Sequence, residues 1–200
     1  MDIKNILIMV VSIVFLGIYL AKLRKTKITT KSMVVVAMFS ALSYILYMIQ
    51  FIKYPQGGGI SLFSMLPAMI LSIVYGTSEG LTCGLIFGLC KLLNGAVIIH
   101  PAQFLLDYIL STMALGLAGV FGNDKKSKMI LGCLLAVVVS VSINIVSGAV
   151  YFGQYAPEGM NVWVYSFIYN ATSAGVEGLL TTVVVVLLPI KKLKTVVNLN

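Results

Sequence analysis

Long apolar stretches separated by short polar segments run through the chain, and the first of them covers residues 6–21. A hydrocarbon core about 30 Å thick is spanned by about 20 apolar residues in a helix. A helix also satisfies its own backbone hydrogen bonds inside lipid. The pattern therefore predicts seven membrane-spanning helices. The six that follow the first are expected at residues 32–52, 60–76, 77–93, 102–122, 129–152 and 162–188.

The third and fourth predicted spans are almost continuous in hydrophobicity. Between residues 60 and 93 the only turn pattern is Tyr-Gly-Thr-Ser-Glu-Gly at residues 75–80. Glycine together with short polar residues is typical of a chain reversal. A tight helical hairpin is expected there.

The composition supports a membrane protein and excludes a soluble globule. Hydrophobic residues make up 60% of the chain and charged residues only 10%, which leaves too little polar surface to cover a water-soluble domain. The net charge of +8 comes mainly from basic clusters at residues 22–31, 125–128 and 191–194. Membrane lipid with anionic headgroups suffices as a partner for this charge, and no nucleic acid is needed.

The basic clusters also predict an orientation. Lys and Arg in short loops are retained on the cytoplasmic side of a membrane. With seven spans, all three clusters fall on one side. We therefore expect a multi-pass protein of the cell membrane with its N-terminus outside and its C-terminus in the cytoplasm.

The first apolar stretch allows two interpretations. Its basic residues follow the apolar region and no A-x-A-like cleavage site closes it, which favours a retained transmembrane anchor over a signal peptide. The expected division of the chain is an anchor with a basic cytoplasmic linker at residues 1–31, a six-helix domain at 32–190, and a basic cytoplasmic tail at 191–200.

The sequence offers no pattern for catalysis or metal binding. The phosphate-binding motif G-x-x-x-x-G-K-[ST] is missing, so ATP-driven transport would require another subunit. His100 is the only histidine, and Cys83, Cys90 and Cys133 lie inside predicted spans without the spacing of metal ligands. We expect no enzyme activity, no catalytic residue, no cofactor and no metal.

Ionisable residues inside the spans are candidates for function because their burial in lipid is costly. Lys91 and Asp107 lie at matching depth near the outer surface, where they form either part of a site or a structural ion pair. Glu177 lies deeper. His100, Gln103, Asp107 and Ser111 are three or four residues apart, which places them on one face of a helix.

Two further spans carry polar stripes, around Asn144 and around Asn170. Together with Tyr165 and the stripe around Asp107 they predict a pocket open to the outside. The alternative is that these polar side chains only link helices through hydrogen bonds. Small residues form a ridge at Gly80, Gly84 and Gly88, which suits close packing either within the chain or against a partner.

Three segments carry a resemblance to a known family. Residues 32–190 resemble the thiamine-specific substrate-binding subunits, or S components, of energy-coupling factor transporters. The matching segments are PQGGGISLFSMLP, HPAQFLLDYILSTMALGLAGVFG and SGAVYFGQYAPEGMNVWVYSFIYN. The resemblance implies an all-α integral membrane protein, with a six-helix S-component-like bundle and one extra N-terminal transmembrane helix. It also implies capture of extracellular thiamine for an ATP-driven importer, whose coupling module consists of a transmembrane subunit and two ATPases.

The resemblance also implies roles for individual residues. Gly57, Gly58 and Gly59 correspond to a loop over the binding site, and Ala37 and Ala41 to a contact with the coupling subunit. The expected substrate-binding residues are Asp107, Tyr108, Tyr165, Asn170, Asn144, Phe152, Lys91 and Gln103.

Three positions depart from the family pattern. Asn144 stands where a histidine is expected, Phe152 where a tryptophan is expected, and Lys91 where a neutral residue or histidine is more usual. A thiamine precursor or another small vitamin is therefore an alternative ligand. A proton-coupled secondary transporter that uses His100, Asp107 and Glu177 is a second alternative, and a structural subunit without a ligand is a third.

Overall fold

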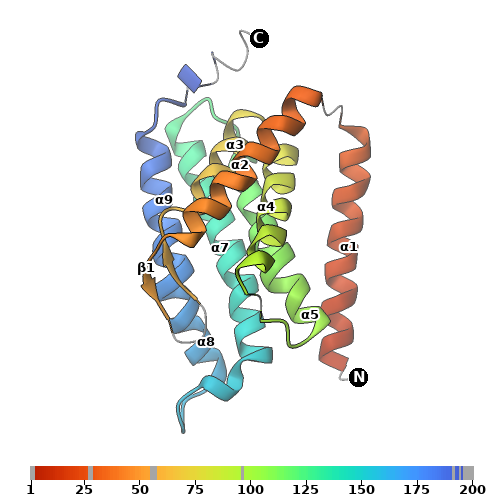
Figure 1. The fold of residues 1–200 in the computed structure, drawn as a ribbon, viewed down its shortest axis with the longest axis vertical. Helices are drawn as coiled ribbons and strands as arrows, with labels where there is room; N and C mark the ends of the chain where they lie inside the picture. Colours follow the sequence, from red (N-terminus) through yellow and green to blue (C-terminus); the bar gives the residue numbers. More distant parts are fainter. Residues whose placement is uncertain are drawn as a thin grey trace.

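The protein is an elongated bundle of helices with a small β-hairpin near one end (Figure 1). The computed structural model describes residues 3–26, 29–54, 58–95, 97–190, 192–193 and 195. Among these residues, five helical segments are long and apolar enough to cross a membrane. The all-α, multi-pass membrane class is thus confirmed. The five segments are Ile3–Lys25, Thr30–Met48, Pro101–Gly119, Lys126–Tyr151 and Val162–Leu187.

Three of the five are single continuous helices, namely α1 (Ile3–Lys25), α2 (Thr30–Met48) and α7 (Lys126–Tyr151). The side chain of Thr29 accepts a hydrogen bond from the backbone N–H of Ser32 and so caps α2. These three helices lie close to the predicted spans. The prediction placed residues 50–52 in the second span, whereas α2 ends at Met48.

The remaining two long segments change helix type along their length. One consists of α5 (Pro101–Phe104), the π-helix η2 (Leu105–Leu110), α6 (Ser111–Met113) and the 3₁₀-helix η3 (Ala114–Gly119). The other consists of α8 (Val162–Asn170), the π-helix η5 (Ala171–Gly175) and α9 (Val176–Leu187). A π-turn widens the helix and rotates the side chains that follow it, and such turns are frequent at functional sites.

The predicted helix over residues 60–76 is wrong in its first part. Strand β1 (Gln50–Lys53) pairs antiparallel with β2 (Gly59–Ser61), and α3 covers only Leu66–Val74. Short apolar runs do not distinguish a strand from a buried helix, which explains the error. At about 1.5 Å of rise per residue, α3 reaches only about half way across a hydrocarbon core.

The glycine ridge packs within the chain. It lies on α4 (Thr77–Lys91), which the 3₁₀-turn η1 (Leu92–Asn94) follows. A Cβ atom at Gly80 would collide with Ser72 of α3, and Cβ atoms at Gly84 and Gly88 would collide with the backbone of Thr112 and Tyr108. The ridge lets α4 approach the α3 and α5–η3 segments to backbone contact, so the internal alternative holds.

Helix α1 packs along the side of the bundle (Figure 1). The hydroxyl groups of Tyr19 and Thr82 share a hydrogen bond of 2.7 Å. The hydroxyl group of Tyr151 donates to Asn5 Oδ1 at 2.8 Å. Tyr19 also forms a small apolar cluster with Ile109 and Met113. The helix outside the six-helix pattern therefore has specific contacts with α4, η2–α6 and α7.

The basic segments gather at one end of the bundle (Figure 1). The C-terminal ends of α1 and α9 and the N-terminal ends of α2 and α7 lie there, whereas the β-hairpin and the starts of α5 and α8 lie toward the opposite end. At the basic end the Lys128 ammonium donates to the Asp124 carboxylate at 3.0 Å, which lowers the pKa of Asp124. The arrangement agrees with the predicted grouping of basic clusters on one side.

Candidate ligand-binding pocket

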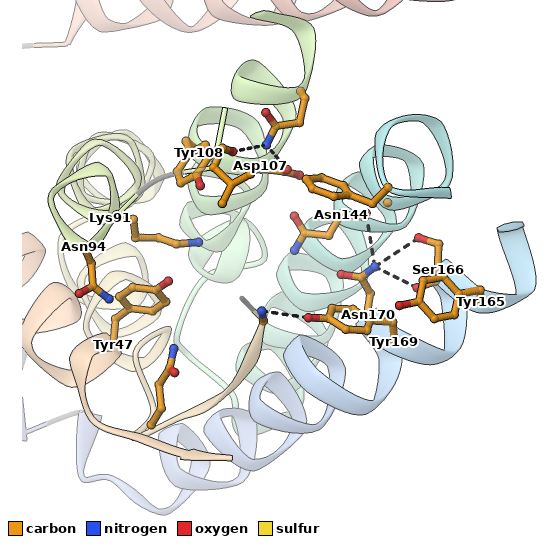
Figure 2. Close-up of a pocket in the computed structure, with 17 residues that line it drawn as sticks. Tyr47, Lys91, Asn94, Asp107, Tyr108, Asn144, Tyr165, Ser166, Tyr169 and Asn170 are labelled. Carbon is orange, nitrogen blue, oxygen red and sulfur yellow. Dashed lines mark hydrogen bonds between the residues drawn. The ribbon is translucent and has the colours of Figure 1, made fainter. Parts of the chain in front are cut away.

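A cavity of about 390 Å³ opens at the end of the bundle that carries the β-hairpin (Figure 2). This volume suits a small organic ligand. The structure brings all eight residues with a predicted substrate-binding role to this cavity. They come from the end of α4, from the α5–η2 segment, from α7 and Phe152 directly after it, and from α8. The described lining consists of Tyr47, Gln50, Gly58, Lys91, Asn94, Gly95, Val97, Gln103, Asp107, Tyr108, Asn144, Gly148, Phe152, Tyr165, Ser166, Tyr169 and Asn170.

Asp107 lies in the π-helix η2 and is held in place by Gln103. The Gln103 amide donates to Asp107 Oδ2 at 2.7 Å and to the carbonyl oxygen of Val97 at 3.3 Å. Its own side-chain oxygen accepts the backbone N–H of Ile99. Gln103 is buried, with 1% of its surface exposed, and it belongs to the cavity wall beside Asp107. It fixes both the carboxylate and the loop that precedes α5.

The opposite wall carries amides and tyrosines from α7 and α8. The Asn170 amide nitrogen donates to the carbonyl oxygens of Ser166, at 2.9 Å, and of Asn144, at 3.4 Å. The amide N–H groups of Asn170 thus donate to backbone carbonyl oxygens of α7 and α8, and these bonds orient its side chain. A Cβ atom at Gly148 would collide with the hydroxyl group of Ser166, so α7 and α8 approach closely here.

Lys91 extends into the cavity from the last turn of α4 (Figure 2). Its ammonium nitrogen lies 5.1 Å from the ring centroid of Tyr47, 5.6 Å from that of Tyr108 and 6.0 Å from that of Phe87. Cations are attracted to aromatic faces at such distances. Among the described residues, the salt bridge that forms joins Lys128 to Asp124, and Lys91 is not part of it. The alternative of a Lys91–Asp107 ion pair is wrong.

The β-hairpin reaches the cavity through Gly58. The backbone N–H of Gly58 donates to the hydroxyl group of Tyr169 at 2.9 Å, and a Cβ atom at Gly58 would lie 2.5 Å from that oxygen. The ring of Tyr54 packs edge-on against Tyr169 at 5.2 Å. At Gly59 a Cβ atom would collide with the carbonyl oxygen of Ile52, whereas Gly57 lies outside the described residues. Glycine is thus required for close approach at two of the three positions.

The hydrogen-bond partners of Glu177 were not predicted from the sequence. Its buried carboxylate accepts the backbone N–H groups of Ser61 and Ser64, both at 2.9 Å, and both serine hydroxyl groups. Between the serines, Phe63 adopts a left-handed backbone with φ of 55°. The Ser-x-x-Ser spacing alone did not show that these groups converge on one carboxylate. Glu177 therefore ties α9 to the base of the β-hairpin.

A smaller cavity of about 150 Å³ lies next to the first and shares Lys91 and Asn144 with it. Glu177, Ser111 and Ser140 are among its lining residues. The polar stripes of α7 and α9 thus reach a second, deeper space besides the main pocket.

Two predicted features lie away from the cavity. His100 caps α5, because its Nδ1 accepts the backbone N–H of Ala102 at 3.1 Å, and its ring stacks on Tyr151. This is a structural role. Ala37 and Ala41 are exposed on the outer face of α2, so they are accessible to lipid or to a partner.

The fold and the cavity define a class: a helical membrane protein with a cavity suited to a small polar ligand near one end of its bundle. A family model described as thiamine transporter protein (Thia_YuaJ) matches residues 33–197. The chain belongs to this family.

Two curated relatives are similar to this chain, and the first is similar enough to support the same membership. The chain is 37% identical over 152 residues to the thiamine transporter ThiT of Bacillus subtilis, covering 68% of this chain and 79% of that protein. It is 28% identical over 172 residues to the thiamine transporter ThiT of Lacticaseibacillus paracasei, covering 76% of this chain and 81% of that protein.

Solved structures agree with the fold. The structure of ThiT from Listeria monocytogenes superposes with a TM-score of 0.70 at 25% identity, over 80% of this chain and 93% of that one. An S component of a bacterial ECF transporter superposes with a TM-score of 0.57 at 18% identity, over 84% and 97%. The second comparison concerns the fold alone. The predicted family and fold are confirmed.

Proposed function

We propose that this chain captures thiamine from outside the cell, as the substrate-binding subunit of an ATP-driven vitamin importer. The observation that carries the proposal is the cavity itself. In a chain of the thiamine transporter family, it gathers Asp107, Asn144, Asn170 and Tyr165 from three separate elements around a space of about 390 Å³.

The chemistry of the lining suits the two rings of thiamine. An aminopyrimidine offers hydrogen-bond donors and acceptors, which the carboxylate of Asp107 and the amide of Asn144 complement. A thiazolium cation is attracted to aromatic faces. Tyr165 and Tyr169 lie 6.1 Å apart between ring centroids on the same helix and supply such faces, and Phe152 adds a third. These three side chains are proposed to contact the ring system.

The β-hairpin is proposed to act as a lid over this pocket. Gly58 and Tyr169 join the hairpin to α8 at the cavity rim, and the Glu177 clamp fixes the base of the hairpin. In this proposal the contact between Gly58 and Tyr169 opens and closes while Glu177 keeps the base of the hairpin attached to α9. Gly58 and Gly59 then allow close approach of the backbone rather than forming a slack linker.

Release into the cell is proposed to depend on a coupling module that consists of a transmembrane subunit and two ATPases. Ala37 and Ala41 on α2 are the proposed contact with this module, because their small side chains allow close helix approach and both are exposed. The basic end of the bundle faces the cytoplasm in this proposal, so the N-terminus and the pocket face outside. Residues 32–190 form the binding domain, and residues 1–31 form the anchor and linker.

The test is calorimetric titration of the detergent-purified chain with thiamine, with its pyrimidine and thiazole halves as separate ligands. Trp163 is 51% exposed and does not line the cavity, so heat is a better readout than tryptophan fluorescence. Saturable binding of thiamine in the nanomolar range is expected. Tight binding of one half without binding of thiamine would mean that the pocket takes a different ligand. The absence of binding by all three compounds would refute capture.

A further inference from the structure

Strand β1 of the hairpin carries exposed apolar side chains. Phe51 is 66% exposed and Ile52 is 48% exposed, and the exposed Lys53 follows them at the end of the strand. In β2, by contrast, Ser61 is buried and donates to Glu177. Adjacent large apolar side chains on a surface, unlike single ones, indicate contact with a partner or a membrane. The hairpin therefore has an inner strand that is fixed to α9 and an outer strand that is exposed.

The exposed surface of β1 continues the lipid-facing surface of α2. Helix α2 is long and apolar enough to cross a membrane, and Leu42, Ile45 and Met48 are exposed along it. Their spacing of three residues places them on one side of the helix. Ile49 is also exposed and leads from this side directly to Phe51. One apolar surface thus runs from α2 onto the hairpin, and the lipid that covers its first part also reaches its second part.

The backbone of β1 limits how deep in the membrane the strand can lie. Among the described residues the sheet has two strands, so one edge of β1 has no strand beside it. In hydrocarbon, an open edge would leave backbone N–H and C=O groups without hydrogen-bond partners. In water, the exposure of Phe51 and Ile52 would be unfavourable. The boundary between lipid headgroups and acyl chains offers both hydrogen-bond partners and apolar surface.

The place of the hairpin and the nature of its last exposed residue agree with this depth. Figure 1 shows the hairpin at the side of the bundle, whereas the loop before α8 extends farther toward that end. Lys53 closes the apolar surface with a charge. A lysine stem can lie along acyl chains while its ammonium group reaches lipid phosphates.

We propose that β1 is a membrane-contact element whose partner is the phospholipid surface of the leaflet on the hairpin side. Phe51 and Ile52 insert at the boundary between headgroups and acyl chains, and Lys53 pairs with lipid phosphate. The hairpin then contacts protein through β2 and lipid through β1, so both determine where it rests. No vitamin takes part in this contact, and the inference stands independently of the proposed function.

A tryptophan in place of Phe51 measures the depth of the strand. The full chain carries Trp163→Phe, which removes its one native tryptophan, together with Phe51→Trp, and is reconstituted in phosphatidylcholine bilayers. The quenchers are lipids brominated near the carbonyl groups, lipids brominated near the chain ends, and acrylamide in the water. We expect the lipids brominated near the carbonyl groups to quench at least about twofold more than those brominated near the chain ends.

Two control variants in the Trp163→Phe chain calibrate the depth. Val14→Trp lies in the middle of α1 at an exposed position, so lipids brominated near the chain ends are expected to quench it most. Glu158→Trp lies in an exposed loop, and acrylamide is expected to quench it most. Lys53→Glu, added to Phe51→Trp, is expected to increase quenching by acrylamide, because a carboxylate is repelled by lipid phosphate.

Four results would contradict the proposal. Acrylamide quenching of Phe51→Trp equal to that of Glu158→Trp would place the strand in water and overturn the contact. A profile equal to that of Val14→Trp would place the strand in hydrocarbon and overturn the boundary position. Protection from all three quenchers would mean that protein, such as a second copy of this chain, covers β1, and would overturn lipid as its partner. An unchanged profile with Lys53→Glu would overturn the pairing with phosphate.

The wild type supplies a measurement that does not depend on the folding of a tryptophan variant. A photoactivated carbene reagent dissolved in the bilayer is expected to label the peptide with Phe51 and Ile52 as strongly as the peptide with Ile45 of α2. Labelling only as weak as that of the peptide with Glu158 would overturn the membrane contact.

Discussion

At the scale of single residues, Asp107 is the clearest test of ligand recognition. Its carboxylate accepts from the Gln103 amide at Oδ2, and the side chain of Ser147 also interacts with it. Asp107→Asn keeps the shape and removes the charge. We expect it to weaken thiamine binding at least about tenfold, or about 1.4 kcal/mol.

Glu79→Gln is the matched control for Asp107→Asn, since it makes the same chemical change at the start of α4, near the basic end. It is expected to bind as the wild type does. Wild-type affinity in Asp107→Asn, measured by the same titration, would remove Asp107 from the binding site.

Glu177 makes a different prediction because its role is to hold two elements together. Glu177→Gln replaces an oxygen acceptor with an amide that faces the N–H and hydroxyl groups of Ser61 and Ser64. Hydrogen bonds to a charged group contribute about 1.5–3 kcal/mol each, so we expect the free energy of unfolding to fall by about 3 kcal/mol. Thermal unfolding in detergent measures the change. Glu158→Gln, in an exposed loop, is the control, and an equal melting temperature in both variants would contradict the clamp.

At the scale of elements, the β-hairpin is the part whose motion can be tested. In Gly58→Val the added Cβ atom would lie 2.5 Å from the hydroxyl oxygen of Tyr169, so the hairpin cannot settle on α8 as it does here. We expect faster dissociation of thiamine and an affinity lower by about tenfold. Stopped-flow or surface-based kinetics measure both rates.

Gly17→Val serves as the control for the hairpin, because nothing in the described structure lies within 4 Å of a Cβ atom at Gly17. It changes the same residue type on α1 and is expected to leave binding kinetics alone. Unchanged association and dissociation rates in Gly58→Val would show that the hairpin is not a lid.

The long helices could be predicted from sequence because about 20 apolar residues in lipid leave few alternatives to a helix. The hairpin could not, since its apolar run is too short to distinguish strand from helix. The π-helices η2 and η5 also leave no mark in an apolar pattern. Both adjoin the cavity, at Asp107 and next to Asn170.

At the level of the site, the stripes around Asp107, Asn144 and Asn170 predicted a shared pocket, and these residues do line one cavity. The contacts of Lys91 with the ring of Tyr47 and of Glu177 with Ser61 could not be predicted, because they join residues far apart in the chain. Their formation depends on how α2, α4 and α9 pack. The ligand roles remain predictions.

At the scale of the whole molecule, α1 and the binding domain can be separated experimentally. The contacts of α1 run through Tyr19 and Asn5 to residues that do not line the cavity. Deletion of residues 1–20 keeps the basic segment before α2. We expect a lower melting temperature, with thiamine affinity within about threefold of the wild type, or less than about 1 kcal/mol.

Titration and thermal unfolding of the shortened chain test this separation. The variant Tyr19→Phe in the full-length chain removes the hydrogen bond between α1 and α4, keeps the bond from Thr82 to the Ser78 carbonyl oxygen, and should reproduce a small part of the stability loss. A large loss of affinity in the shortened chain would show that α1 shapes the pocket.

The position of α1 also limits how this protein can assemble. Because α1 covers the flank formed by α4 and the α5–η2 segment, that part of the perimeter is sterically closed to another membrane helix. The outer face of α2, with the small side chains of Ala37 and Ala41, carries no such cover. A coupling subunit would therefore approach from a restricted range of directions, and α1 limits the geometry of the complex.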